Sequence, residues 1–484
     1  GGTIKLDGNY PTGTDNVALG NTALDSVEAG GDNNVAIGDN SLTANTTGAG
    51  NTAVGKDSLI SNTTGSTNTA VGLCSLNANT TADNNTAVGR GALKLNTTGA
   101  SNVGVGRNAL EANTDTSFNV AVGVDALKTN DADANTALGY VALCSNTTGT
   151  TNVAVGRSAL CKNTTASSNT AVGSNSLRAN TTGASNTSVG SSALIANTTG
   201  ASNVAVGTLA LDANTTASFN TAVGRISLSS NTTGASNTAV GYCSLYTNTT
   251  ASENTALGSC SLKANTTGAG NTAVGVSALC LNTTGCCNTA LGRNSLLLNT
   301  IGCQNVGIGA AALDANTEGN FNTTIGYASL SANTTADNNT AVGFKSLGAN
   351  TTGTQNVAMG SSALCKNTTG IKNTAIGVQA LCGNTTTSCN VAIGQNAMLY
   401  NNGGCNVAIG VSALQNNSSG DVYNVAVGYQ ALCNNTGDNN AGIGALSLLS
   451  NTTGCQNVAV GFESLNANTT GARNLAIGYE SLCS

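Results

Sequence analysis

Residues 51–67 read NTAVGKDSLISNTTGST, and residues 68–84 follow at once with NTAVGLCSLNANTTADN. Both stretches open on Asn and carry Gly, Leu and Asn at their fifth, ninth and twelfth positions. The pattern recurs 28 times from Asn16 to the end of the chain, usually with a period of 17. A fixed period of this length indicates a repeat architecture, in which each repeat forms one structural unit.

Numbering each repeat from its opening Asn shows which positions are constant. Position 5 is Gly in every repeat, and position 9 is Leu in all but one, where Met398 stands. We expect the few changes of length to fall in loops. The repeats that are longer by one residue begin at Asn16 and Asn406, and those that are shorter by one residue begin at Asn119, Asn390 and Asn424.

The residue types within a repeat predict short strands and turns. Positions 2–4 carry β-branched and small residues between Asn and Gly, which is typical of a strand. Positions 8–10 predict a second short strand, and the Asn-Thr-Thr-Gly segment at positions 12–15 predicts a turn. The Gly at position 5 indicates either a corner with positive φ or a close approach of two backbones.

Such repeats predict an all-β chain, a parallel β-solenoid of 28 coils. One unit cannot bury its own apolar side chains, whereas a stack of coils about 4.8 Å apart can, and it would form a rod of roughly 130 Å. The aliphatic residue at position 4 and Leu at position 9 are expected to form the core, while the Asn residues form amide ladders. Two example repeats place this ladder at Asn51, Val54, Gly55, Leu59 and Asn62, and at Asn237, Val240, Gly241, Leu245 and Asn248.

The chain divides into two parts. Residues 1–15 do not repeat and contain Pro11, the one proline, so we expect a cap or a joint to an upstream segment. Residues 16–484 are expected to form the repetitive shaft. The chain opens on Gly1 and stops within a repeat, which predicts a processed product or a piece of a longer polypeptide.

Strand alternation also predicts assembly. Positions 2 and 4 point to one face and positions 3 and 5 to the other, and neither face carries charge. We expect the small Ala/Gly face to be buried against other chains, in a homo-oligomer. The alternative is a single chain that leaves this face exposed.

Composition excludes several classes of function. Charged residues are 8% of the chain and the net charge is −6, so no basic patch exists for nucleic acid or an anionic membrane. No apolar run reaches the ~18 residues of a membrane span. The chain has no His, which excludes Ser-His and Cys-His nucleophile pairs and the usual His-containing metal sites. We therefore predict neither an enzyme nor a bound cofactor or metal.

Two motifs resemble functional sites. Asp131, Asp133 and Asn135 alternate as in a calcium loop, but Thr136 and Ala142 stand where that loop needs Gly and Glu, so a turn is the better interpretation. Asn-Thr-Thr recurs as an N-glycosylation sequon. Ladder bonding explains the same Asn residues, and glycans remain the alternative for a secreted eukaryotic protein.

The 16 cysteines occupy few positions of the repeat. Stacked neighbours about 4.8 Å apart lie within the Cα range of a disulfide. Disulfides and buried thiols that act as small apolar fillers both remain open. Four pairs stand one full repeat apart: Cys144 and Cys161, Cys243 and Cys260, Cys286 and Cys303, and Cys365 and Cys382.

Across residues 16–484, the pattern NTAVG…SL…NTTG resembles the repeats of phage tail-fibre proteins that end in an endosialidase-type intramolecular chaperone. It is similar, more loosely, to the head repeats of trimeric autotransporter adhesins. The resemblance implies a homotrimer of left-handed β-rolls with a role in attachment. The chaperone itself is absent from this sequence, and Ser484 fits the Ser after which that chaperone cuts itself off.

The resulting expectation is the structural rod of a trimeric viral attachment fibre on the virion surface. Its partners would be further copies of itself, other virion proteins at its ends, and a glycan or protein receptor on the host. The first alternative is a bacterial or eukaryotic cell-surface adhesin or extracellular filament subunit. The second is an ice-binding solenoid, since stacked Thr residues can form a regular array.

Overall fold

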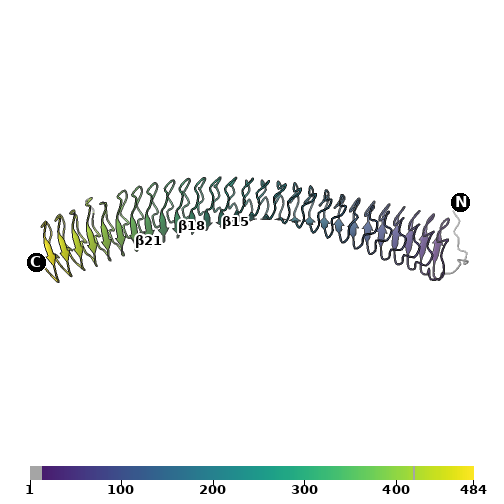
Figure 1. Ribbon diagram of the computed structural model, residues 1–484, viewed down its shortest axis with the longest axis horizontal. Coiled ribbons are helices and arrows are strands. Elements are labelled where there is room, and N and C mark those ends of the chain that lie inside the picture. Colours follow the sequence, from purple (N-terminus) through teal and green to yellow (C-terminus); the bar gives the residue numbers. More distant parts are fainter. Residues whose placement is uncertain (1–12, 418–419, 484) are drawn as a thin grey trace. The chain divides into compact units, whose positions relative to one another are not determined.

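The computed structural model describes residues 13–417 and 420–483, so most of the predicted cap over residues 1–15 lies outside it. Within these residues it contains 28 parallel strands and no helix, and each repeat of the sequence makes one coil of a β-solenoid (Figure 1). The predicted fold class is confirmed. The chain divides into two compact units, residues 1–237 and residues 238–484, which are described separately below.

Every strand has three residues and occupies positions 2–4 of its repeat. The first unit contains β1 (Val17–Leu19), β2 (Val35–Ile37), β3 (Thr52–Val54), β4 (Thr69–Val71), β5 (Thr86–Val88), β6 (Val103–Val105), β7 (Val120–Val122), β8 (Thr136–Leu138), β9 (Val153–Val155), β10 (Thr170–Val172), β11 (Thr187–Val189), β12 (Val204–Val206) and β13 (Thr221–Val223). The second unit contains β14 (Thr238–Val240), β15 (Thr255–Leu257), β16 (Thr272–Val274), β17 (Thr289–Leu291), β18 (Val306–Ile308), β19 (Thr323–Ile325), β20 (Thr340–Val342), β21 (Val357–Met359), β22 (Thr374–Ile376), β23 (Val391–Ile393), β24 (Val407–Ile409), β25 (Val425–Val427), β26 (Ala441–Ile443), β27 (Val458–Val460) and β28 (Leu475–Ile477).

Neighbouring strands within a unit pair in parallel and in register. Ala53 of β3 lies opposite Ala70 of β4, one repeat further along the chain. The register also holds across a shortened repeat, because Ala392 of β23 lies opposite Ala408 of β24. The changes of repeat length therefore fall outside the strands, as expected.

The predicted second strand at positions 8–10 is wrong. In the third coil, Ser58 N donates to Gly55 O at 3.4 Å and Asn62 N donates to Leu59 O at 3.1 Å, so this segment consists of two successive turns. Leu59 has φ of 49°, in the left-handed region that bulky residues seldom adopt. The turns bend the chain around the Leu side chain, which is fully buried.

The predicted core is wrong at position 4. Ala53 and Leu59 are fully buried, whereas Val54 is only half-buried. Strand alternation points position 3 inward, and the interior has little room there: a Cβ added at Gly104 would lie 3.3 Å from Leu93 Cγ. The small Ala/Gly residues thus pack inside their own coil and do not form the surface that we expected to meet other chains.

Both expectations for the Gly at position 5 hold. Gly55 has φ of 137° and ends β3 at a corner, and a Cβ there would lie 2.5 Å from Gly72 O in the next coil. Gly241 repeats this geometry with φ of 135°, since its Cβ would lie 2.6 Å from Gly258 O. Any other residue at this position would clash with the neighbouring backbone.

Candidate functional site

The Asn residues at position 12 form a ladder of side-chain amides. Asn62 Nδ2 donates to Asn45 Oδ1 at 2.8 Å and to Gly65 O at 2.9 Å, and all of these atoms are buried. In the second unit, Asn265 Nδ2 donates to Asn248 Oδ1 at 2.9 Å. Each amide nitrogen thus closes its own turn and binds the preceding coil, which satisfies buried polar groups that would otherwise destabilise the fold.

The Asn residues at position 1 form a second ladder. Asn68 N donates to Asn51 Oδ1 at 2.9 Å, and Asn51 Nδ2 donates to Gly65 O at 2.8 Å. Asn237 N likewise donates to Asn220 Oδ1 at 2.9 Å. Gly65 O therefore accepts hydrogen bonds from both ladders, which joins the two sides of the coil.

The ladders bear on the glycosylation motif. Asn62 opens an Asn-Thr-Thr sequon, yet its side chain is fully buried and its amide nitrogen donates two hydrogen bonds within the fold. A glycan on this nitrogen would require the turn to open and would break the ladder. The geometry of the folded coil therefore favours the structural interpretation of these Asn residues.

The outward face is the name used below for the side chains at positions 2 and 4 of the strands. Position 2 is mostly Thr or Val, position 4 is always Val, Leu, Ile or Met, and none of the 28 described strands has a charged residue at either position. Leu138, Leu257 and Leu291 are nearly half exposed, at 48%, 47% and 46%. The result is a continuous uncharged face along each unit.

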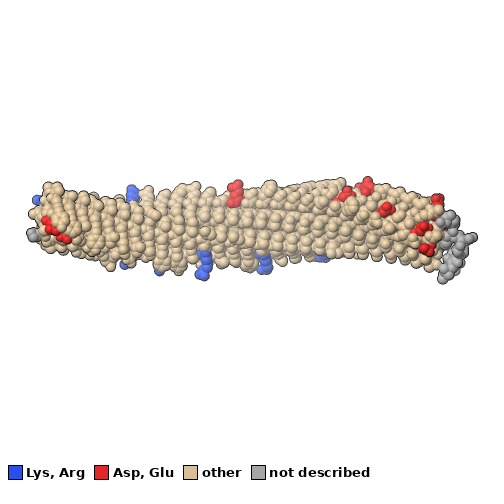
Figure 2. Space-filling model, turned by 90° about the horizontal axis from the view of Figure 1, so that it is seen from below, with Lys and Arg blue, Asp and Glu red and all other residues tan. Residues whose placement is uncertain are grey.

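Charged side chains lie on the turns. Lys56 and Asp57 follow directly on the Gly that ends β3, and Lys56 Nζ lies 3.2 Å from Asp39 Oδ2 in the preceding coil. Figure 2 shows that few acidic or basic side chains lie on one face of the molecule, most of which is formed by uncharged residues.

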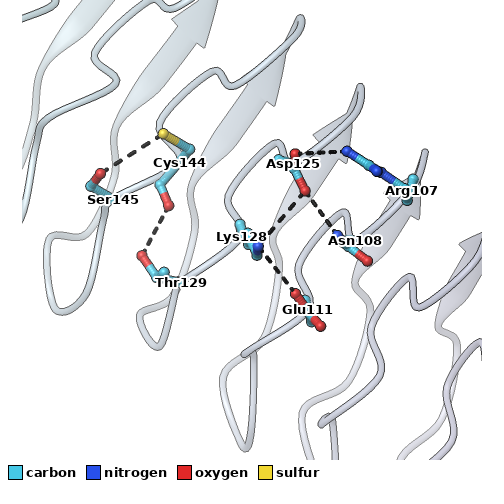
Figure 3. A network of polar contacts seen from close by, with 8 residues as sticks. All are labelled: Arg107, Asn108, Glu111, Asp125, Lys128, Thr129, Cys144 and Ser145. Atoms are coloured by element: carbon cyan, nitrogen blue, oxygen red, sulfur yellow. Dashed lines mark hydrogen bonds and ion pairs between the residues drawn. The ribbon is translucent and has the colours of Figure 1, made fainter.

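A group of four charged side chains lies on two neighbouring coils of the first unit (Figure 3). Arg107 Nη2 lies 3.3 Å from Asp125 Oδ2, and Lys128 Nζ lies 3.8 Å from Glu111 Oε2 and 4.0 Å from Asp125 Oδ1. Asn108 Nδ2 also donates to Asp125 Oδ1 at 2.9 Å. These side chains are partly exposed, so each pair contributes at most about 1 kcal/mol to the stability of the coil stack.

The segment that resembles a calcium loop, residues 131–135, forms hydrogen bonds between neighbouring turns. Asp131 Oδ1 accepts a hydrogen bond from Thr114 Oγ1 at 2.7 Å, and Asp133 Oδ1 accepts one from Ser117 N at 2.7 Å. Asn135 is buried in the position-1 ladder, where its backbone nitrogen donates to Asn119 Oδ1 at 2.9 Å. The two carboxylates thus bind the preceding coil, and Asn135 joins that coil through its backbone, so the three side chains do not converge on one point.

The four cysteine pairs differ in their contacts. Cys365 and Cys382 form a disulfide, with Cα atoms 5.0 Å apart. The Sγ atoms of Cys144 and Cys161 lie 2.9 Å apart, as do those of Cys286 and Cys303. Cys243 and Cys260 are both free thiols, and Cys243 is buried.

These contacts shift the acidity of the thiols. The hydrogen bond from Cys161 lowers the pKa of Cys144 to about 6, and the same bond raises the pKa of Cys161. The bond to Cys303 raises the pKa of Cys286 to about 12. Cys144 is therefore the thiolate, and hence the nucleophile, of its pair near neutral pH.

A fifth pair was missed by sequence reasoning. Cys389 and Cys405 each precede the opening Asn of the next repeat, and burial together with the neighbouring Cys389 raises the pKa of Cys405. They are separated by less than the usual period because the repeat that begins at Asn390 is one residue short. Counting backwards from each opening Asn, instead of searching at a fixed spacing, would have revealed them.

The chain matches no protein-family model and no curated protein sequence. The described residues contain no cluster of three or more His, Cys, Asp or Glu side chains that could hold a metal ion. No helix within the described part of the chain has the length and apolar character needed to cross a membrane. The outward face and the stacked cysteine pairs are thus the features that bear on function.

Proposed function

We propose that this protein is the structural rod of a homotrimeric attachment fibre, carried on the surface of a virion. The outward face is the observation that supports this function. It is uncharged at every described strand, and its position-4 side chains are half-buried or exposed, as at Val172, which is half-buried, and Leu138, which is 48% exposed. Soluble monomers seldom expose contiguous apolar patches larger than a few hundred Å².

Other copies of the chain are the partner that fits this face. Another copy presents the same Thr and Val residues at the same coil spacing of about 4.8 Å, so side chains can interdigitate coil by coil along the rod. The face also carries no charge whose burial would have to be compensated. A closed cyclic assembly buries every copy of the face, and the number three comes from the resemblance to trimeric phage fibres.

Contact with a host fits the turns better than the outward face. A hollow of about 410 Å³ in the second unit is lined by Lys366, Gly383, Tyr400, Asn402 and Asn416. Its ammonium group, exposed phenol ring and amides suit a host-surface glycan, and the three copies of the hollow in one fibre would multiply a weak contact. Other virion proteins would hold the ends of the rod.

A cell-surface adhesin or extracellular filament subunit is the second candidate. The disulfide between Cys365 and Cys382 favours it, because disulfides persist mainly outside the cytosol. Ice binding is the minor candidate. The strands place Thr beside an aliphatic residue on the outward face, and this face would be free for ice only in a single chain.

Adding charge to the outward face tests the assembly. Val172→Lys together with Val206→Lys adds two cations to this face, and light scattering should show the mass falling from three chains to one. The matched control, Ser174→Lys with Thr208→Lys, adds the same charge at position 6, where Arg157 and Arg225 already stand. An outward-face variant that keeps the mass of the unmodified protein would overturn the proposed interface.

A further inference from the structure

Four exposed aromatic residues recur at one corner of the solenoid at a regular interval. They occupy the position directly before an opening Asn, where most other coils have a small or polar residue. They belong to the sixth, twelfth, eighteenth and twenty-fourth coils, so the interval is six coils each time. These corner aromatics are Phe118, Phe219, Phe321 and Tyr423.

The corner conformation does not favour these residues. Phe118 and Phe219 both have φ of 63°, and Phe321 has φ of 58°, in the left-handed region where Gly, Asn and Asp are the residues most easily accommodated. The backbone bond at the corner needs no ring, because Phe118 N donates to Ala100 O at 3.2 Å just as Ser101 N donates to Asp83 O at 3.1 Å. The aromatic side chains are therefore not required by the turn.

The corner aromatics also gain little from their own chain. Phe118, Phe219, Phe321 and Tyr423 are 68%, 65%, 57% and 62% exposed. In the first unit, the corner residues of the coils on either side of Phe219 are Ser202 and Ser236, which are too small to cover a ring. Large aromatic side chains held out in this way are typical of contacts with a partner.

A second aromatic series has the same interval. Tyr140, Tyr242 and Phe344 stand at position 6, just after the Gly that ends a strand, in the eighth, fourteenth and twentieth coils. They are 56%, 48% and 49% exposed, and each lies two coils after a corner aromatic. Position 6 also carries four rings outside this series: Tyr327, Tyr429, Phe462 and Tyr479. The interval of six coils is therefore kept strictly only by the corner aromatics.

A uniform repeat leaves the assembly with a register problem. Sliding one copy past another by one coil, about 4.8 Å, returns the same Thr and Val contacts along the outward face. The proposed fibre therefore needs features that differ from coil to coil. Within each unit the corner aromatics are six coils apart, or roughly 29 Å, and a slip of one coil would move every ring away from its partner site.

We propose that the corner aromatics fix the axial register between copies of this chain, an inference that rests on the proposed assembly. The partner is a second copy because it shares the six-coil interval, so both rings of each unit find equivalent sites at once. A partner with a different period would meet only one ring at a time. In the first unit, the corner residues between Phe118 and Phe219 are Ala, Thr and Ser, which leave space for the rings of the neighbouring copy.

The test replaces the four rings by Ser or Asn, which stand at the same corner in other coils. The variant Phe118→Ser, Phe219→Ser, Phe321→Asn and Tyr423→Asn should keep the circular dichroism spectrum and the native mass of the unmodified protein. A diazirine-bearing amino acid in place of Val189 then reports the register, through mass spectrometry of the cross-linked peptides. The unmodified corners should give cross-links to one coil of the partner, and the variant should spread them over several coils.

The matched control changes Ser101, Ser168, Ser185 and Ser236 to Asn, at the same corner, and should keep the single register. A ring-free variant that still cross-links to one coil would overturn the register role and leave the proposed function intact. A variant that falls to single-chain mass would also overturn it, because the rings would then be needed for association itself. Single-chain mass of the unmodified protein would overturn the proposed function first.

Discussion

At the scale of single residues, the Leu at position 9 determines the shape of the coil. Leu177 has φ of 52° and is fully buried, whereas Val172 of the same coil is half-buried. The left-handed conformation costs roughly 1–2 kcal/mol, and burial of a Leu side chain contributes about 1.5–3 kcal/mol, so burial outweighs the strain. The Leu is tolerated at a turn because it fills the interior.

Truncation should therefore separate these two residues. Leu177→Ala should lower the free energy of unfolding by about 2–5 kcal/mol. Val172→Ala leaves no cavity inside the coil and removes methyl groups only at the proposed interface, so it should lower this free energy by only about 1 kcal/mol. Hydrogen exchange of the amides in the neighbouring coils measures the local loss. Equal effects of the two substitutions would mean that position 4 belongs to the core after all.

The acidity of Cys144 gives a prediction with a defined pH range. In the reduced protein, its lowered pKa of about 6 leaves it largely thiolate at pH 7, whereas burial raises the pKa of Cys280 in the same column of the second unit. Iodoacetamide should thus alkylate Cys144 faster than Cys280 at pH 7, and the rate at Cys144 should fall as the pH drops below 6. Peptide mass spectrometry that finds equal rates at pH 7 would contradict the assigned hydrogen bond.

At the scale of the coil, the sulfur contacts predict disulfide formation. With glutathione disulfide, the Cys144 thiolate should displace one glutathione, and Cys161 should then release the second to complete the bond. The product links two neighbouring coils of one chain. Non-reducing gels should show no change of chain number, and digestion should yield a linked peptide pair; a mixed disulfide that persists on Cys144 would contradict the geometry.

The Gly at position 5 makes the stack sensitive to a single methyl group. A Cβ at Gly173 would lie 2.5 Å from Gly190 O, at φ of 132°, so Gly173→Ala should open the corner and destabilise the coil by several kcal/mol. Gly104→Ala is the matched control, because it restores the usual Ala at position 3 and meets no atom nearer than 3.2 Å. Circular dichroism melts should show a large drop for the first variant only.

The coil also shows how far the sequence could predict the structure. The period of 17, the parallel register and the Asn columns follow from constant residue types, and the strand at positions 2–4 was correctly placed. The second strand was not, because Ser-Leu-x shows the same alternation in a strand and in a pair of turns. The sequence also predicts Val54 in the core, because alternation shows that positions 3 and 4 point to opposite faces but not which face lies inside. The bend at Leu59 determines this, and it places Ala53 inside.

At the scale of the assembled molecule, the candidate surface could be predicted only in part. The absence of charge at positions 2–5 indicated a face for other chains, but the sequence could not tell that Ala53 packs against its own Leu and leaves Thr52 and Val54 outside. The cysteine columns were visible, whereas the pair Cys389 and Cys405 was hidden by a one-residue deletion. The proposed interface therefore consists of positions 2 and 4 instead of positions 3 and 5. The oligomer itself remains a proposal.

The most direct measurement is the native mass of the unmodified chain, by light scattering, with and without a reductant. We expect a mass near three chains, about three times 47.2 kDa, under both conditions, because the outward face holds the copies together and the cysteines join coils of one chain. A single-chain mass in both samples would contradict the proposed trimer and leave a solenoid with an exposed apolar face. A mass that falls to one chain only on reduction would assign the association to the cysteines instead.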